Sequence, residues 1–259
     1  MRILLLGEAS FVHTMLRDAF RAMGHDVILM SDGCAKRNCP RDIDMKRNMK
    51  YGKLGGITVL WKLLRNVGHL LGNDIVQISC PEFVPLRPHW NKLLMPLLKI
   101  GNKRLVKCCF GDDAVLFMGQ AAGKLRYSDT HIGTRPINEK ENKERISDQF
   151  IPEFIDALYY ANNKANALVP CLYEYFVYYN LPQYKDKLYY VPLPIEIPHF
   201  SGEENMRRRV KKPVKVLVGI QSDRDYIKGA EVIAKYVERI AAENPGSLEV
   251  KKVYDVPYN

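Results

Sequence analysis

The chain has 259 residues, 47% of them apolar, which is enough for two α/β domains of modest size with a buried core. No apolar run approaches the roughly 18–20 residues of a membrane span, and the N-terminus has no signal-peptide cleavage pattern, so we expect a soluble, cytoplasmic chain. The formal net charge of +10 favours an anionic partner, either a membrane surface or a phosphorylated substrate; a solvated surface without a partner is the alternative. No nucleic-acid-binding motif accompanies the charge, so nucleic acid is not predicted as a partner. The six cysteines lack metal-ligand spacing, which predicts reduced, mostly buried thiols and no metal site.

The N-terminal segment has the pattern of a βαβ unit. Arg2–Leu6 is an apolar strand, helical spacing of apolar residues follows over Val12–Met23, and Val27–Met30 is a second strand. This order predicts a parallel sheet. The turn that contains Gly7 and Ser10 lacks the Gly-x-Gly-x-x-Gly fingerprint, so no NAD site is predicted. From spacing alone, a plain tight turn is the alternative to a site at these two residues.

The next segment leads to a third strand. Ser31–Tyr51 is a long basic excursion, and Asp74–Ser79 is a short strand that ends before Cys80-Pro81-Glu82. Between them the spacing predicts one helix, and we expect its apolar stripe to face the core. That stripe consists of Ile57, Leu60, Trp61, Leu64, Val67 and Leu71.

A fourth strand follows a proline-rich stretch. Prolines 85, 88 and 96 predict that no long helix forms there, only a short apolar segment at Leu93–Ile100. Arg104–Phe110 is the strand, and Asp112 is a candidate N-cap for the element that follows its turn. Gly119–Ile151 is polar without clear periodicity and predicts no function.

The remainder of this first domain alternates short apolar and tyrosine-rich segments. Ala165–Val169 predicts a strand, Leu172–Tyr179 a helix, and Leu188–Val191 the last strand. Packing explains the tyrosines of this helix better than sugar stacking does. Composition then places the domain boundaries: a first domain over 1–197, a charged linker over 198–213, and a second domain over 214–259.

The second domain opens on a strand, a polar loop and a helix. The strand starts at Val214 and reaches Gly219, and the loop carries Arg224 and Lys228 before Gly229. The first amides of a helix favour negative charge, and two cations add to that preference. The pattern therefore indicates an anion site, with phosphate as the natural ligand, and an ordinary charged loop is the alternative.

These motifs resemble those of GT-B glycosyltransferases, the large group of retaining enzymes that use nucleotide-sugar donors. The resemblance is best at residues 1–30, at Asp74–Ser79 and at Val214–Ile233. It implies an α/β fold of GT-B architecture, with a Rossmann-like N-terminal domain built on a parallel sheet and a second Rossmann-like domain. In that second domain it implies that Arg224, Lys228 and Gly229, after Gly219, hold the diphosphate of the donor.

The same resemblance implies a cleft near the first-domain turns. It places Gly7, Ser10 and Gly111 in contact with substrate, and Asp113 at the reaction centre. The family's His-Gly-x-Asp turn reads Phe110-Gly111-Asp112-Asp113 here, so the histidine is missing. The implied reaction moves a sugar from a nucleotide-diphosphate donor to a saccharide or lipid-linked acceptor in cell-surface polysaccharide synthesis. No cofactor or metal is needed, and peripheral contact with the inner face of an anionic membrane fits the charge.

One part of the family's pattern has no counterpart in this sequence. The acidic Glu-x7-Glu motif that grips the donor's ribose and sugar is missing, so we expect the second domain to be incomplete. Two alternatives stay open: a non-catalytic module that binds sugar phosphates or polyanions, and a GT-B epimerase of nucleotide sugars. The identity of sugar, nucleotide and acceptor is not readable from the residues.

Overall fold

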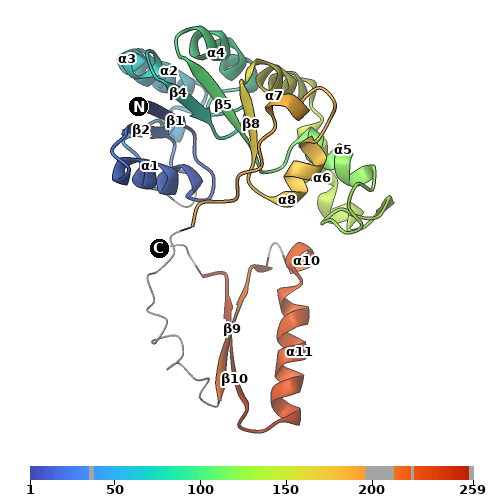
Figure 1. Ribbon diagram of the computed structural model, residues 1–259. Helices are drawn as coiled ribbons and strands as arrows, with labels where there is room; N and C mark the ends of the chain where they lie inside the picture. The colour runs from blue at the N-terminus through green and yellow to red at the C-terminus, as the bar shows by residue number, and fades with distance from the viewer. Residues whose placement is uncertain (35–37, 196–212, 223–224, 257–259) are drawn as a thin grey trace. The chain divides into compact units, whose positions relative to one another are not determined.

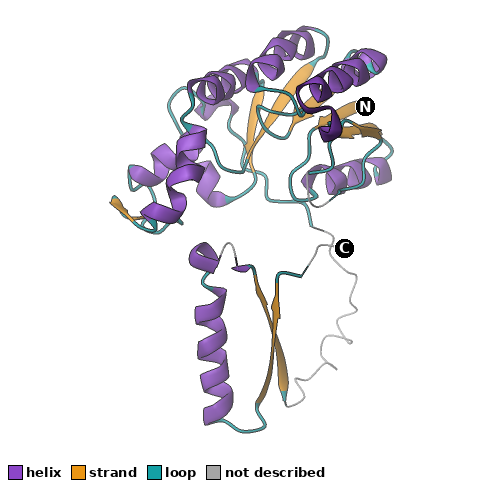
Figure 2. Cartoon of the chain, turned by 180° about the vertical axis from the view of Figure 1, so that it is seen from behind, coloured by secondary structure: helices purple, strands orange, loops and turns teal. Residues whose placement is uncertain are grey.

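The computed structural model describes residues 1–34, 38–195, 213–222 and 225–256. The chain divides into two compact units, Met1–Ile195 and Glu196–Asn259. Figure 1 shows the helices and strands of both units, and Figure 2 shows them from behind, coloured by secondary structure. Of the predicted linker, residues 198–212 lie outside the described part of the chain.

The first unit is a Rossmann-like α/β domain, as the sequence predicts. Its described residues form a six-stranded sheet in the order β3-β2-β1-β4-β5-β8, and every neighbouring pair is parallel. The strands are β1 (Arg2–Leu6), β2 (Asp26–Ser31), β3 (Ile43–Asp44), β4 (Ile75–Ile78), β5 (Arg104–Cys109) and β8 (Ala167–Pro170).

Helices cover the two faces of this sheet, because successive residues of each strand point to opposite sides. On one face, Ile3 and Leu5 pack with residues of helix α1 such as Phe20. On the other face, Leu4 and Leu6 belong to a larger core that takes residues from four helices. The helices are α1 (Val12–Ala22), and on the second face α2 (Gly55–Arg65), α3 (Val67–Leu70), α4 (Pro88–Ile100) and α7 (Pro152–Lys164).

The buried side of α2 is not the predicted one. Val59 and Leu63 enter the core, whereas Trp61 is 66% exposed and Leu64 is 68% exposed. The helix is apolar over most of its circumference, so periodicity alone could not decide which stripe faces the sheet. The single helix predicted over Ile57–Leu71 is also divided into α2 and α3.

The prediction that prolines prevent a long helix before β5 was wrong. α4 runs for 13 residues with Pro88 in its first turn, where a missing N–H costs nothing. Pro96 lies inside the helix on its exposed side, where water can reach the carbonyl that loses its partner.

Between β5 and α7 the polar stretch that carried no prediction forms an ordered excursion. Arg145 holds it together through ion pairs with Asp112 and Asp129. The predicted strand at Leu188–Val191 is instead an extended segment with one β-bridge to β8, at Leu188. The elements are α5 (Ala114–Ala121), the hairpin β6 (His131–Ile132) and β7 (Arg135–Pro136), α6 (Glu139–Gln149), α8 (Tyr173–Tyr179), and the 3-10 turns η2 (Met49–Leu54) and η3 (Lys185–Lys187).

The second unit is a small βαβ arrangement. Strands β9 (Val214–Ile220) and β10 (Leu248–Tyr254) are parallel, and α11 (Ala230–Glu243) connects them after the short α10 (Asp225–Lys228). Val218 and Ile220 pack against Ala230 and Ala234 of α11. Side chains on the other side of this two-stranded sheet face solvent; Leu217, for example, is 68% exposed.

Candidate functional site

The strand order places a switch point between β1 and β4. After β1 the chain continues to β2 on one side, and after β4 it continues to β5 on the other side. The loops that follow these two neighbouring strands therefore lead away in opposite directions. In doubly wound sheets, ligands bind outside the carboxyl ends of the strands at such a point. The two loops meet at Gly7, where an added Cβ would lie 2.2 Å from Ser79 Oγ and 3.2 Å from the Phe83 carbonyl oxygen. Gly7 therefore permits close approach of the two loops.

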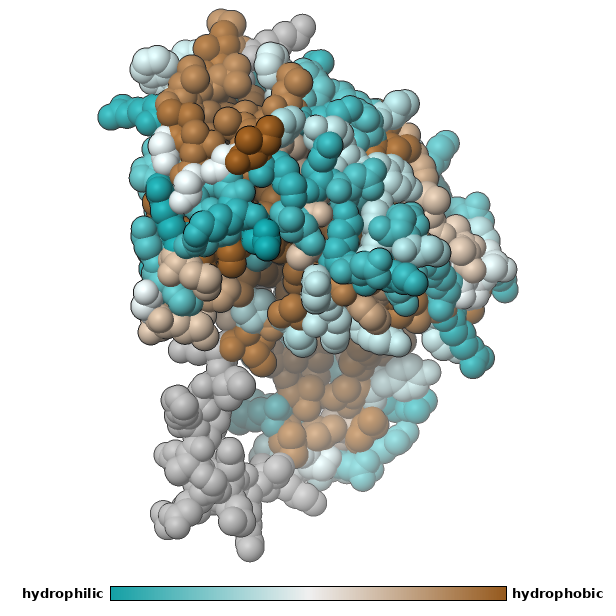
Figure 3. Space-filling view, turned by 45° about the horizontal axis from the view of Figure 1, so that its top comes forward, coloured by the Kyte–Doolittle hydropathy of each residue, from teal (hydrophilic) through white to brown (hydrophobic). Residues whose placement is uncertain are grey.

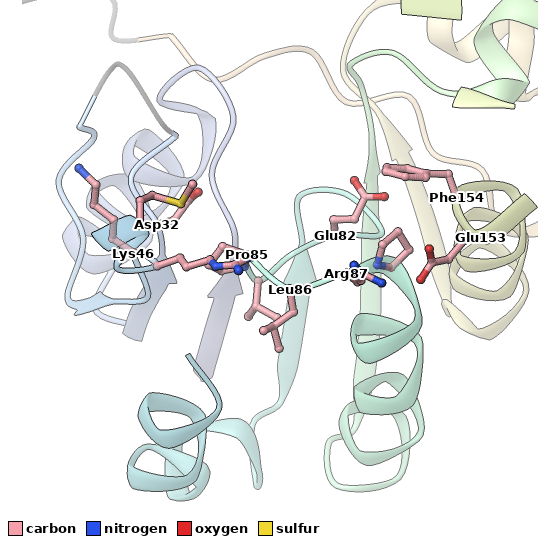
Figure 4. A pocket seen from close by; sticks show the side chains of 12 residues that line it. Asp32, Lys46, Glu82, Pro85, Leu86, Arg87, Glu153 and Phe154 are labelled. Carbon is pink, nitrogen blue, oxygen red and sulfur yellow. The ribbon is translucent and has the colours of Figure 1, made fainter. Parts of the chain in front are cut away.

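Three cavities adjoin at this edge of the first unit, and Glu82 lines all of them. The largest has a volume of about 650 Å³, within the range of small-molecule sites. A second, of about 190 Å³, reaches Gly7 and Ser79. A third, of about 40 Å³, lies between Glu82 and Asp113 and has room for ordered water. Figure 4 shows the largest cavity, with Asp32 and Lys46 on one side, Glu153 and Phe154 from α7 on the other, and Glu82 between them.

The carboxyl group of Glu82 is electrostatically unusual. Burial, with the negative charge of Glu153 added, raises its pKa to about 7, although Lys107 acts in the opposite direction. Because the protonated and ionised forms are then similarly populated near neutral pH, this group can accept or donate a proton there. Glu153 itself is held by a hydrogen bond to His89, which lowers the pKa of Glu153.

Two arginines line the largest cavity. Arg47 and Arg87 line it together with an adjoining hollow of about 330 Å³ that His89 and Trp90 complete. Arg47 donates one hydrogen bond to the Gly52 carbonyl, while its buried Nε has no hydrogen-bond partner among the described residues. This Nε packs toward Gly55, where an added Cβ would lie 3.1 Å from it, so it does not face the cavity.

The turn after β1 offers less to a ligand than the resemblance implies. The Glu8 carboxylate accepts hydrogen bonds from the backbone N–H of His13 at 3.1 Å and of Thr14 at 2.8 Å. It thus occupies the first-turn amides of α1 that an anion would otherwise use. Ser10 has a positive φ of 53° and is exposed, and it lines none of the cavities described above.

Asp113 lies beside Glu82 but is already occupied. One of its oxygens accepts the N–H of Leu116 at 2.8 Å and caps α5, and the other accepts the Tyr179 hydroxyl. Tyr179 also accepts a hydrogen bond from buried Lys107, whose Nζ lies 3.2 Å from the hydroxyl. The backbone N–H of Gly111 donates to the Tyr175 hydroxyl at 3.1 Å. N-capping, proposed for Asp112, falls to Asp113, and Asp112 pairs with Arg145.

In the second unit, part of the predicted anion site is occupied by the chain itself. Lys228 Nζ donates to the Gln221 side chain at 2.7 Å, and Asp225 accepts the N–H of Glu231 at the start of α11 at 3.0 Å. Gly229 precedes this helix with a φ of 61°. Gly219 lies within β9 and pairs with Val253, and Arg224 lies outside the described residues.

Sequence reasoning missed the three residues that dominate the first-unit cavities, namely Glu82, Arg47 and Arg87. Glu82 is the fourth residue after β4, where ligand-contacting residues of parallel sheets are found, so its position was a usable signal. The two arginines come from segments far apart in the chain, and only the fold brings them to one cavity.

The fold and this edge define a doubly wound α/β protein whose switch point carries a groove, formed by these cavities and lined by both charged and apolar side chains. No known protein-family model matches the sequence. No curated protein matches it either.

Proposed function

We propose that the chain is a glycosyltransferase of the GT-B type, which moves a sugar from a nucleotide-diphosphate donor to an anionic saccharide or lipid-linked acceptor. The observation that carries this proposal is Glu82, a carboxyl group with a pKa of about 7 in a cavity of about 650 Å³ at the switch point. A sugar-transfer reaction requires a group that receives the proton of the acceptor hydroxyl, and a carboxylate of this pKa suits that task at neutral pH.

The first unit would hold the acceptor. Its hydroxyl would face Glu82, and a phosphate of the acceptor would contact Arg47 and Arg87 in the same cavity. Planar guanidinium groups bind phosphate oxygens in pairs of hydrogen bonds, which fixes orientation as well as charge. Gly7 belongs to the wall of this site through the adjoining cavity.

The second unit would hold the donor. By the resemblance, Arg224 and Lys228 neutralise the diphosphate as it leaves, with Gly229 beside them, so that no metal is required. For that contact Lys228 would exchange its hydrogen bond to Gln221 for one to the donor. In the reaction the bond between the anomeric carbon and the diphosphate oxygen breaks, a bond to the acceptor oxygen forms, and the acceptor proton passes to Glu82.

A second candidate is a non-catalytic module that binds sugar phosphates or polyanions. The presence of Arg47 and Arg87 in the same cavity favours it, because two guanidinium groups can bind an anion whether or not a reaction follows. The occupied state of Asp113 also favours it, since a carboxylate that caps a helix and holds Tyr179 is not free for a substrate.

A transfer assay separates these candidates. The protein is incubated with a panel of radiolabelled nucleotide sugars, with and without a mixture of lipid-linked and free saccharide acceptors, and the products are separated. Acceptor-dependent transfer of label supports a glycosyltransferase. Conversion of the donor without an acceptor supports an epimerase, and binding without any turnover supports the module.

A further inference from the structure

One surface of the first unit carries a set of large apolar side chains that the protein itself does not cover. They lie on the outer sides of α2 and α4, and we call them the α2–α4 surface. Leu64 is 68% exposed, Leu93 65% and Ile100 85%. Figure 3 looks onto the side of these helices and shows apolar side chains gathered there, bordered by hydrophilic ones. The surface consists of Ile57, Trp61, Leu64, Trp90, Leu93, Leu97 and Ile100.

The spacing along each helix makes this a continuous feature of the fold. Ile57, Trp61 and Leu64 follow one another at steps of four and three residues on α2, so they share one side of the helix. The exposed residues of α4 follow the same rule. Both helices pack through their other sides into one core on the same face of the sheet. Monomeric soluble proteins rarely leave such a group uncovered without an interaction partner.

The two segments that contain α2 and α4 carry an excess of positive charge. Residues 45–73 and 83–111, which contain both helices, include no Asp or Glu. Three of their cations pair with acids from other segments: Lys62 with Asp44, Lys92 with Asp156 and Lys103 with Asp74. Lys107 is buried in β5, and the other described cations in these two segments are Lys46, Arg47, Lys50, Arg65, Arg87, Lys99 and Arg104.

We propose that the α2–α4 surface docks the protein onto an anionic lipid bilayer. Apolar side chains would enter the boundary between headgroups and acyl chains, while the neighbouring cations contact lipid phosphates. Both tryptophans of the chain lie on this surface, with Trp61 66% and Trp90 43% exposed, and tryptophan favours that boundary. A protein partner or a second copy would need no such excess of positive charge.

This inference deepens the proposed function, because it names the surface that would bring the acceptor groove to a lipid-linked substrate. Trp90 belongs both to the α2–α4 surface and to the hollow that Arg47 and Arg87 line. A phosphate at the membrane surface would therefore lie near the hollow that Arg47 and Arg87 line. The docking itself does not depend on sugar transfer.

Intrinsic tryptophan fluorescence tests the docking directly, because both tryptophans, Trp61 and Trp90, lie on the α2–α4 surface. The full chain is titrated with vesicles of phosphatidylcholine alone and with phosphatidylglycerol added, some of them carrying brominated acyl chains. Binding to the anionic vesicles, a blue shift of the emission and quenching by the brominated chains are expected. Raising the salt concentration should weaken binding, because the charges act at an exposed surface.

Matched variants assign the contact to this surface. Leu64→Ser should weaken vesicle partitioning by roughly tenfold, since burial of a leucine contributes on the order of the energy that corresponds to such a change. Met23→Ser is the control, because Met23 is 69% exposed at the end of α1, on the other face of the sheet. Its partitioning should equal that of the wild type.

The outcomes separate this inference from the proposed function. Equal partitioning of the two variants, or self-association in place of vesicle binding, overturns the inference. Transfer to a detergent-dissolved acceptor should survive Leu64→Ser, since this residue lies outside the groove. Vesicle binding without transfer to any acceptor supports the docking and overturns only the sugar-transfer reading.

Discussion

The Tyr179 hydroxyl donates a hydrogen bond to the carboxylate of Asp113, the residue that the family resemblance places at the reaction centre. Burial, together with the charge of Asp113, raises the pKa of Tyr179, so this hydroxyl stays protonated and keeps donating. The contact joins α8 to the start of α5 across the end of β5. Asp113 therefore has a structural role, and in any catalytic role its carboxylate would still have to keep these contacts.

This role predicts the effect of removing the carboxylate. Asp113→Ala deletes the cap of α5 and leaves the buried Tyr179 hydroxyl without its acceptor, so it should lower the free energy of unfolding by roughly 2–4 kcal/mol. Urea denaturation measures the loss. Asp148→Ala, at an exposed position on α6, should change stability little. Equal effects at the two positions would contradict the structural role.

The close approach at Gly7 predicts a second destabilising substitution. Gly7→Ala adds a methyl group at a φ of 76° and at 2.2 Å from Ser79 Oγ, whereas Gly24→Ala adds one at a φ of 82° with nothing within 4 Å. Backbone strain is common to both, and it costs on the order of 1 kcal/mol. Gly7→Ala should therefore lose more stability than Gly24→Ala in thermal unfolding, and the difference measures the contact between the two loops. Replacing Ser79 with Ala in the Gly7→Ala background should recover part of it.

His13 predicts a dependence of stability on acid pH. It is fully buried, its Nδ1 lies 2.8 Å from the Gly7 carbonyl oxygen, and burial lowers its pKa below the ordinary value of 6.5 despite the opposing charge of Glu8. Below pH 6.5, His13 therefore becomes protonated in the unfolded chain but stays neutral in the folded chain. The free energy of unfolding then falls as the pH falls. In His13→Gln this contribution to the slope should disappear. An unchanged slope below pH 6.5 would contradict the buried, neutral imidazole.

Glu82 predicts the opposite slope. Its pKa is raised from 4.5 to about 7 in the folded protein, so between these values the folded chain holds a proton that the unfolded chain has lost. Stability should therefore fall as the pH rises from 4.5 to about 7 and stay level above that range. Glu82→Gln should remove this fall in stability, so at neutral pH the variant should unfold at a higher denaturant concentration than the wild type. A strained functional carboxyl commonly has this stability cost.

Much of the fold follows from local patterns in the sequence. The apolar runs at Arg2–Leu6, Asp74–Ser79 and Arg104–Phe110 predict three strands of the parallel sheet, and the structure confirms that sheet. The buried stripe of α2 was not predictable, because apolar residues surround that helix and only packing selects a side. α4 was missed because Pro96 suggested a break that an exposed carbonyl avoids.

The candidate site was predicted less well, for a physical reason. Gly7 and Asp113 lie at strand ends, which local patterns reveal, and both line cavities that Glu82 shares. The pKa of Glu82 depends on burial and on Glu153, which is 71 positions further along the chain, so no local pattern could indicate it. The occupation of Asp113 by Tyr179 is equally non-local.

The measurement that tests the account most directly is the pH dependence of sugar transfer in the wild type and in Glu82→Gln. If Glu82 receives the acceptor proton, kcat/KM of the wild type rises with pH through a value near 7, the pKa of this group. The variant should lose roughly 100-fold or more of this activity together with that rise. Transfer at the wild-type rate with the same pH profile in Glu82→Gln, or no transfer by the folded wild type with any donor, would contradict the account.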